Sequence, residues 1–324
     1  MNELKKYNWK VCVSCMTYNH APYILDALNG FCMQETDFPF VCTIVDDAST
    51  DGEPEVIRSY LEENFNLKDF SVGRKEETDD FVLIFAQHKT NINCFFAVLF
   101  LKYNHYQLKK NKLPYLKEWR DNAQYLAICE GDDYWIDSSK LQCQVDFLDL
   151  HPDHSMCFHA HNNLMPNGDI NTLHRYNQSL DNCPIRDMIL IGGGYAKVNS
   201  MMFHPFLADY KEWTNSIGIG DLPFQLSLFV RGKVAYIDRV MSCYRVMSIG
   251  SWSATQSSSL KKMQSHNKKI IMLWNNFDKW TNYKYHSIII QKLQINKKNY
   301  YKSIIFFFYS MLRNKIKKIF TRFQ

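Results

Sequence analysis

The chain has 324 residues, of which 46% are hydrophobic and 15% aromatic; this excludes a disordered protein and allows one large domain with an appendage. The formal net charge is +5, but no Asp or Glu follows Asp278 whereas eleven Lys or Arg do, so residues 1–278 carry 5 − 11 = −6. A net negative body argues against nucleic-acid binding.

Ten cysteines are scattered along the chain, many of them in apolar, strand-like runs. This usage is typical of a reducing compartment, where Cys serves as a small hydrophobic residue. Cys12 and Cys15 could form half of a zinc or redox site, but their apolar neighbours and the lack of a second pair favour buried strand positions. The first six residues lack the apolar core of a signal peptide, so we expect no export.

Three apolar runs, each ending in polar residues, organise the first half of the chain. We predict that each run is a strand and that helical segments over residues 22–31, 53–65 and 139–150 follow them. Because parallel strands end at the same edge of a sheet, the polar residues should form one site. The runs and their polar ends are 11–16 with Thr17, Tyr18 and Asn19; 40–45 with Asp46 and Asp47; and 125–129 with Glu130, Asp132 and Asp133.

The third polar end places three carboxylates within four positions, Glu130 to Asp133. Like charges this close repel, so such a cluster persists where a cation or a proton compensates it. The pattern indicates a divalent-metal site that faces a phosphate. The alternative is a solvated acidic turn before a helix, since Asp137 and Ser138 are good capping residues.

In this order, the motifs resemble the family-2 nucleotide-sugar glycosyltransferases, which have the GT-A fold. The resemblance covers roughly residues 9–252 and implies an α/β, Rossmann-like architecture: a mixed, mainly parallel sheet flanked by helices, with a C-terminal helical extension. The matching segments are Thr17-Tyr18-Asn19, then 45–52, and then 130–135 continuing to Lys140-Leu141.

For the donor, the resemblance implies that Thr17, Tyr18 and Asn19 lie against the nucleotide base and that Asp47 holds the base or the ribose. An aromatic ring offers stacking area, and a carboxylate can accept an imide or hydroxyl proton. The alternative for Asp47 is an Asx-turn before Gly52.

For the metal, the resemblance implies Mn or Mg bound chiefly by Asp132, with Glu130 or Asp133 contributing to the ribose or the metal. The ion would neutralise the departing diphosphate. Arg245 is available for a phosphate.

Asp221 begins a predicted helix that runs to Arg231, a position where an isolated Asp is usually a helix cap. The resemblance implies instead that Asp221 is the catalytic base, which takes the proton of the attacking acceptor hydroxyl and leads to inversion. Two residues depart from the family pattern. Gly220 replaces a common Glu, and Met247 stands where a His often follows.

The segments between the motifs are less regular. We expect residues 66–80 to be irregular, 81–85, 155–161 and 198–203 to be strands, and 95–106 to be a helix. The family often has a Gly-rich segment and an Arg near the donor diphosphate; this chain has neither, and Lys89 is the only candidate there. The histidines at 151, 154, 159 and 161 fit no common zinc pattern, although one could meet the acceptor.

The C-terminal part is Ser-rich and then helical. Residues 248–259 predict a mobile loop that could close over the donor, and helices are expected over 260–276 and 283–295. Residues 304–323 form an apolar stripe opposite Lys317 and Lys318, too short to span a bilayer. Such a basic amphipathic helix suits an anionic membrane surface; the alternative is burial on its own body or in a dimer.

We therefore expect residues 1–247 to form the catalytic domain, 248–259 the loop and 260–324 the helical extension. The expected activity is inverting, metal-assisted transfer from a nucleotide sugar, a UDP-sugar being favoured, to a glycan or lipid-linked acceptor in surface polysaccharide synthesis. The expected location is the cytoplasmic side of the cell membrane.

Two other functions stay open. The first is a nucleotidyltransferase, which would typically need a Gly-rich loop to bind a triphosphate; residues 17–22 do not form such a loop. A non-catalytic, membrane-docked module of the same fold is the second, and the acidic cluster and Asp221 argue against it. The sequence predicts neither the sugar nor the oligomeric state.

Overall fold

The computed structural model describes residues 8–320 except Phe70, Asp209, 215–216, Ile219 and 248–258. It divides into two compact units, of which the first comprises Met1–Cys183, Gly193–Asp209 and Ser227–Ile249. The second comprises Pro184–Gly192, Tyr210–Leu226 and Gly250–Gln324. Most of the predicted Ser-rich loop, residues 248–258, lies outside the described residues.

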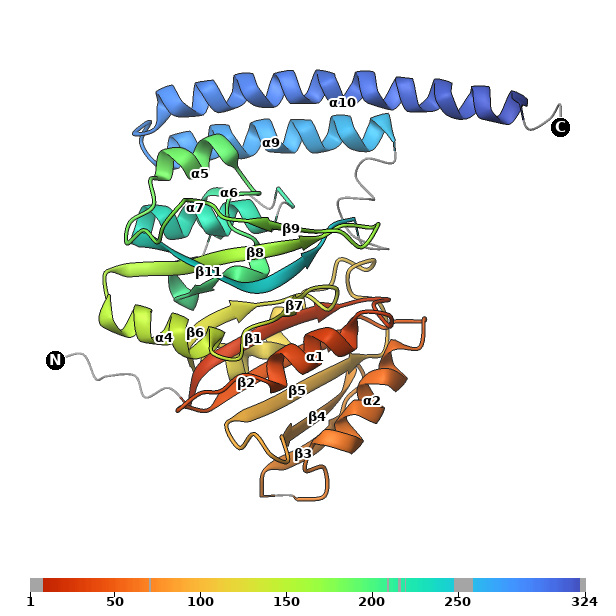
Figure 1. The fold of residues 1–324 in the computed structure, drawn as a ribbon, viewed down its shortest axis with the longest axis vertical. Helices are drawn as coiled ribbons and strands as arrows, with labels where there is room; N and C mark the ends of the chain where they lie inside the picture. The colour runs from red at the N-terminus through yellow and green to blue at the C-terminus, as the bar shows by residue number, and fades with distance from the viewer. Residues whose placement is uncertain are drawn as a thin grey trace. The chain divides into compact units, whose positions relative to one another are not determined.

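The first unit is built on one mixed sheet, as predicted (Figure 1). The strands are β1 (Trp9–Thr17), β2 (Phe40–Asp46), β3 (Gly73–Glu77), β4 (Phe81–Gln87), β5 (Cys94–Leu101), β6 (Ala123–Ile128), β7 (Tyr134–Trp135), β8 (His154–Leu164), β9 (Ile170–Leu173), β10 (Met202–Phe203) and β11 (Lys233–Arg245). Their order is β3-β4-β5-β2-β1-β6-β10-β8-β11-β7, with β9 on β8. The neighbours β5, β2, β1 and β6 pair in parallel, as do β8 and β11, and the other pairs are antiparallel.

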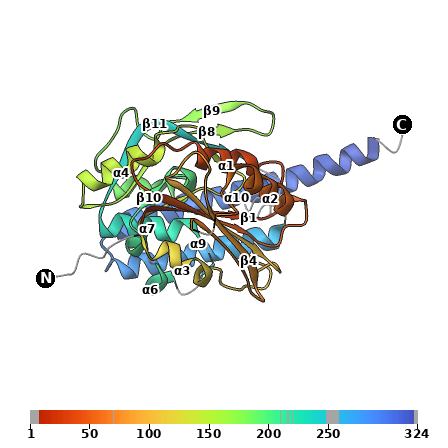
Figure 2. The same cartoon turned by 90° about the horizontal axis from the view of Figure 1, so that it is seen from below.

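Helices α1 and α2 lie side by side against the parallel strands (Figures 1 and 2). Gly52, at a positive φ of 91°, turns the chain into α2, and Pro54 stands in its first turn, a position that suits its fixed φ. The Phe31 ring of α1 packs edge-on against Phe96 and Trp135. The helices of this unit are α1 (Ile24–Cys32), α2 (Glu53–Asn64), α3 (Lys117–Arg120) and α4 (Lys140–Leu150), with 3-10 turns at Leu113–Leu116, Val198–Ser200 and Pro205–Ala208.

The buried strands explain the cysteine usage. Cys12 and Cys15 are buried in β1, and all ten cysteines are free thiols. All seven residues of β2 are buried, as expected for a strand covered on both faces. The predicted structural role of Cys12 and Cys15 is therefore confirmed.

The structure corrects the predictions between the motifs. The helix expected over residues 95–106 is wrong, because Cys94–Leu101 is the strand β5 between β2 and β4. An apolar run without alternation fits a buried strand and a buried helix equally well. The region 66–80 also contains the edge strand β3, and only Met202–Phe203 of the predicted strand 198–203 is extended.

The second unit is helical. Its helices are α5 (Ile185–Ile191), α6 (Lys211–Thr214), α9 (Leu260–Trp280) and α10 (His286–Phe320), and α7 (Asp221–Arg231) begins in it. Trp213 of α6 stacks on Trp280 of α9, and Lys292 of α10 donates to the carbonyls of Leu190 and Ile191 at the end of α5. Helices α9 and α10 run side by side, and α10 extends beyond α9 (Figures 1 and 2). Among the described helices, none combines the length and the apolarity needed to cross a bilayer.

Candidate functional site

The first unit brings the three polar strand ends together at one edge of the sheet. Thr17 pairs with Asp46 across β1 and β2, and the amide of Asp47 donates to the carbonyl of Thr17 at 3.0 Å. On the other side of β1, the amide of Gly131 donates to the carbonyl of Met16 at 3.1 Å. The motifs are therefore neighbours through backbone hydrogen bonds.

Gly131 allows the acidic segment to approach β1 closely. A Cβ atom at this position would lie 2.7 Å from the Cβ of Thr17 and closer still to its Oγ1. Real Cβ atoms do not approach so closely, so only glycine fits without a shift. The absence of a side chain at Gly131 thus positions the carboxylates on either side of it.

Glu53 organises the loop that follows β1, a role that the sequence analysis missed. It is fully buried at the first position of α2, where the helix dipole favours a negative charge. Its carboxylate accepts hydrogen bonds from the hydroxyls of Thr17 and Ser49 and from the amide of His20. The signal in the sequence was an acid directly after the turn at Gly52.

Asn19 joins the same network and holds the loop against the end of β2. It has a positive φ of 57°, a conformation that Asn tolerates better than most residues. Its side-chain oxygen accepts a hydrogen bond from the backbone amide of Thr50 at 2.8 Å, and its backbone amide donates to the hydroxyl of Ser49 at 2.8 Å. Tyr18, between Thr17 and Asn19, is half-buried.

The two acids that end β2 have different surroundings. Burial raises the pKa of Asp46 to about 6. The side chain of Asp47 is only 3% exposed and forms an ion pair with Lys112 at 2.8 Å. Its two oxygens also accept from the amides of His105 at 2.7 Å and Tyr106 at 3.1 Å. Asp47 is therefore bound to the segment after β5, a contact that no local motif predicts.

The three carboxylates after β6 differ in their surroundings. Glu130 accepts from the amide of Met16 at 3.2 Å. Asp133 is 1% exposed and accepts from the amide of Arg245 at 2.8 Å; burial and the charge of Asp132 raise the pKa of its carboxyl well above the usual range. Asp132 is less buried than Asp133.

Arg245, at the end of β11, closes this cluster. Its guanidinium donates to the carbonyl of Asp132 at 2.7 Å and forms an ion pair with Asp26 of α1. It also lies over the rings of Tyr23 and Tyr134, 4.9 Å and 4.6 Å from their centroids. The guanidinium of Arg245 is therefore held beside the acidic segment, and its phosphate-binding role stays a prediction.

The side chains at this edge fit a metal only in part. Across the part of the chain that the structure describes, no three His, Cys, Asp or Glu side chains are arranged to hold an ion, and the histidines at 154, 159 and 161 are buried. Mg typically binds one or two carboxylates and completes its shell with phosphates and water. Asp132 fits that requirement, whereas the buried carboxylate of Asp133 is already used by Arg245. The metal roles of both residues stay predictions.

Asp221 belongs to the second unit, where it is the exposed first residue of α7. The predicted helix from Asp221 to Arg231 is thus confirmed. Gly220, which replaces the common Glu of the family, is exposed as well. The catalytic role of Asp221 stays a prediction.

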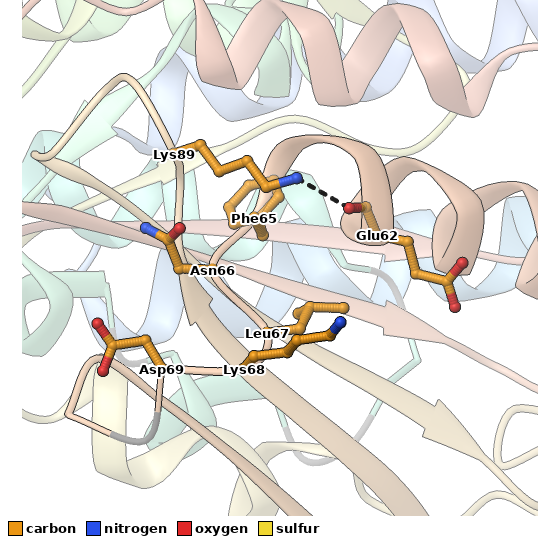
Figure 3. Close-up of a pocket in the computed structure, with 7 residues that line it drawn as sticks. All are labelled: Glu62, Phe65, Asn66, Leu67, Lys68, Asp69 and Lys89. Atoms are coloured by element: carbon orange, nitrogen blue, oxygen red, sulfur yellow. Dashed lines mark hydrogen bonds between the residues drawn. The ribbon is translucent and has the colours of Figure 1, made fainter.

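Lys89 lies at the opposite edge of the sheet from the acidic cluster. Its ammonium donates to the carbonyls of Glu62 and Glu63 at the end of α2, so the structure does not place it with the residues predicted to bind the donor. It borders a cavity of about 930 Å³ (Figure 3). The other residues that line this cavity are Glu62, Phe65, Asn66, Leu67, Lys68 and Asp69.

The mixed sheet, with its polar residues at the carboxyl edge, defines a GT-A-like fold. Residues 12–78 match the family model described as Glycosyl transferase family 2. The resemblance drawn from the motifs is therefore confirmed over this segment, and the fold of the chain is GT-A-like.

Curated relatives come from mycobacteria. The chain is 28% identical over 255 residues to Uncharacterized protein Rv1520 of Mycobacterium tuberculosis and to Uncharacterized protein Mb1547 of Mycobacterium bovis. Each match covers 76% of this chain and 61% of the relative. The chain thus spans about three fifths of the length of the curated relatives it matches.

Solved structures are similar in fold. S. aureus TarS 1–349 in complex with UDP-GlcNAc has a TM-score of 0.51 and 14% identity, over 86% of this chain and 73% of that chain. The complex of TarS 1–349 with UDP has a TM-score of 0.48 and 15% identity, over 82% and 65%. The mannosyltransferase PcManGT of Pyrobaculum calidifontis, in complex with GDP-Man and Mn2+, has a TM-score of 0.47 and 14% identity, over 83% and 64%.

Proposed function

We propose that this protein is an inverting, metal-assisted glycosyltransferase that moves a sugar from a nucleotide-sugar donor to a hydroxyl of a glycan or lipid-linked acceptor. The observation that carries the proposal is the convergence of Thr17, Asp47, Asp132 and Arg245 at one edge of the sheet. This edge offers polar groups to a nucleoside and both charge signs to a diphosphate. A UDP-sugar is the favoured donor, by analogy with the UDP-GlcNAc bound to TarS.

In this proposal each residue has a distinct task. The nucleoside is bordered by Thr17, Tyr18, Asn19 and Asp47, which contact it directly or are held in position by the hydrogen-bond network of Glu53. Asp132, with Glu130 or Asp133, would hold Mg or Mn, which supplies charge neutralisation for the departing diphosphate. Arg245 adds a second fixed positive charge, because its contacts with Asp132 and Asp26 hold its guanidinium in place.

Asp221 would act as the general base. A carboxylate at the exposed start of α7 can take the proton of an acceptor hydroxyl, whose oxygen then bonds to the anomeric carbon while the nucleoside diphosphate leaves from the opposite face. The result is an inverted anomeric configuration. Synthesis of a surface polysaccharide is the biological setting that we propose for this reaction.

The proposal is tested by ligand-dependent stabilisation and by transfer. UDP, GDP and dTDP and their sugars are added with and without Mn or Mg, and unfolding is followed thermally. Ligand at 100 times its Kd should stabilise the protein by about 2.7 kcal/mol. Asp132→Asn should weaken the metal-dependent part of UDP binding and reduce turnover. If no nucleoside diphosphate or nucleotide sugar binds, the proposal fails; pyrophosphate release from a nucleoside triphosphate would favour a nucleotidyltransferase.

We also propose that α10 holds the enzyme on the cytoplasmic face of the membrane, close to a lipid-linked acceptor. The supporting observation is a group of exposed apolar side chains over residues 301–309, in the middle of α10. Phe306 is 71% exposed, and Lys297, Lys298 and Lys302 on the same helix are exposed too. Exposed aromatic residues beside lysines are complementary to an anionic lipid surface. The exposed apolar side chains are Tyr301, Ile305, Phe306, Phe308 and Tyr309.

A further inference from the structure

In the ion pair between Asp47 and Lys112, at the end of β2, the carboxylate is shielded from solvent by its hydrogen-bond donors, whereas the ammonium is partly exposed. Asp47 accepts from two backbone amides and from Lys112, and a carboxylate has about four acceptor positions. The side chain of Asp47 is 3% exposed, whereas that of Lys112 is 20% exposed. Of the two partners, Lys112 is therefore the one that reaches solvent.

The segment that carries Lys112 is held at several points besides this ion pair. The side-chain amide of Asn104 donates to the carbonyl of Asp47 at 3.0 Å. His105 is fully buried and lies within hydrogen-bond distance of the Tyr115 hydroxyl, which donates to Asp80 at 2.7 Å. These contacts fix the backbone on both sides of Lys112, so its ammonium is positioned in advance.

We propose that Lys112 is a donor-binding residue whose ammonium donates hydrogen bonds to oxygens of a nucleoside diphosphate, and that Asp47 positions it. An ammonium has three N–H donors and no acceptor; Asp47 takes one and leaves two for a ligand. Acceptor oxygens occur on the phosphates and on the carbonyls of uracil, thymine and guanine. The inference rests on the proposed function, because it assigns a further contact to the same site.

The test compares Lys112→Met with Lys109→Met, an exposed lysine on the same segment. UDP is titrated calorimetrically into each full-length variant in the presence of Mg. Loss of a charge-assisted hydrogen bond costs about 1.5–3 kcal/mol, so Lys112→Met should raise the Kd for UDP about 10- to 150-fold. Lys109→Met should leave it unchanged, and Lys112→Arg should retain part of the affinity.

Two further arms identify the contact and separate positioning from stability. If the loss persists with uridine, Lys112 contacts the base; if it is confined to UDP, the contact is a phosphate. Asp47→Asn alone should weaken UDP binding, whereas adding it to the Lys112→Met variant should cause little further loss of affinity. Thermal unfolding of every variant identifies any that bind poorly because they are unfolded. If Lys112→Met is one of these, the UDP affinity of the Lys112→Arg variant tests the contact instead.

Two results would overturn the inference. Wild-type UDP affinity in folded Lys112→Met would remove Lys112 from the site and leave the proposed function standing. Additive losses in the Asp47→Asn, Lys112→Met double variant would show that Asp47 does not act through Lys112. Failure of the wild-type protein to bind any nucleotide would overturn the proposed function itself.

Discussion

Single residues carry charge into the core of the first unit, and Lys140 is the clearest case. It is fully buried; its ammonium donates to Gln144 at 2.7 Å and lies 4.0 Å from the centre of the Trp135 ring. Burial lowers the pKa of Lys140 from its usual 10.5 to about 7. Between these two values the unfolded chain binds a proton that the folded chain lacks.

This difference predicts a pH dependence of stability. Because the unfolded state holds more protons between about pH 7 and 10.5, Lys140 should make the free energy of unfolding rise with pH, by at most about 1.4 kcal/mol per unit. Lys140→Met should lose that contribution and be more stable at pH 7, since it removes a buried charge. Denaturant unfolding from pH 7 to 9.5 measures both effects, with Lys102→Met as an exposed control. Equal slopes in Lys140→Met and wild type would contradict the prediction.

Asp221 is the residue on which the proposed reaction depends most directly. Asp221→Asn keeps the size and most of the helix-capping ability, so folding should survive while transfer falls by roughly 10²–10⁴. UDP binding should hardly change. Asp187→Asn is a matched control, because Asp187 also stands in the first turn of a helix of the second unit. Near-normal transfer by Asp221→Asn would show that Asp221 is not the general base and only caps the helix.

At the scale of elements, the site depends on how closely β1 and the turn after β6 approach each other. Gly131→Ala places a Cβ 2.7 Å from that of Thr17, which should force the two segments apart. We expect a loss of about 1–3 kcal/mol in stability and weaker metal-dependent UDP binding. Gly194→Ala is the control, since among the described residues, its two chain neighbours aside, no atom lies within 4 Å of the added Cβ. Unchanged UDP binding in Gly131→Ala would show that the acidic cluster does not need this contact.

The same scale shows what could be predicted from the sequence. The strands that end in Thr17, Asp46 and the acidic cluster were predictable, because each apolar run stops abruptly at polar residues. Strand β5 was not, because its residues are apolar on both faces and their pattern has no period of two. The ion pair between Asp47 and Lys112 joins residues far apart in sequence, and it depends on the path of the chain after β5. Glu53 lay in a predicted helix, but its hydrogen-bond partners Thr17, His20 and Ser49 come from the end of β1 and from the loops after β1 and β2.

At the scale of the whole molecule, the charge distribution separates an acidic body from a basic end. Residues 1–278 carry a net charge of −6, whereas eleven Lys or Arg and no Asp or Glu follow. An anionic membrane would repel residues 1–278 and attract the basic residues that follow Asp278. Each Lys or Arg near such a surface contributes about 1 kcal/mol, so several together can outweigh the repulsion. Helix α10 adds the exposed ring of Phe306, 71% exposed, and its apolar neighbours.

This arrangement predicts that removal of residues 300–324 releases the protein from phosphatidylglycerol vesicles while UDP binding persists. High salt should release the full-length protein in part, because screening weakens only the electrostatic share of the attraction. Phe306→Ser tests the apolar share with every charge kept, and phosphatidylcholine vesicles are the control for surface charge. Sedimentation with vesicles and a parallel UDP titration measure both properties. If the full-length chain does not bind vesicles and the truncated chain unfolds or loses a dimer, the end of α10 is a packing element and the membrane proposal fails.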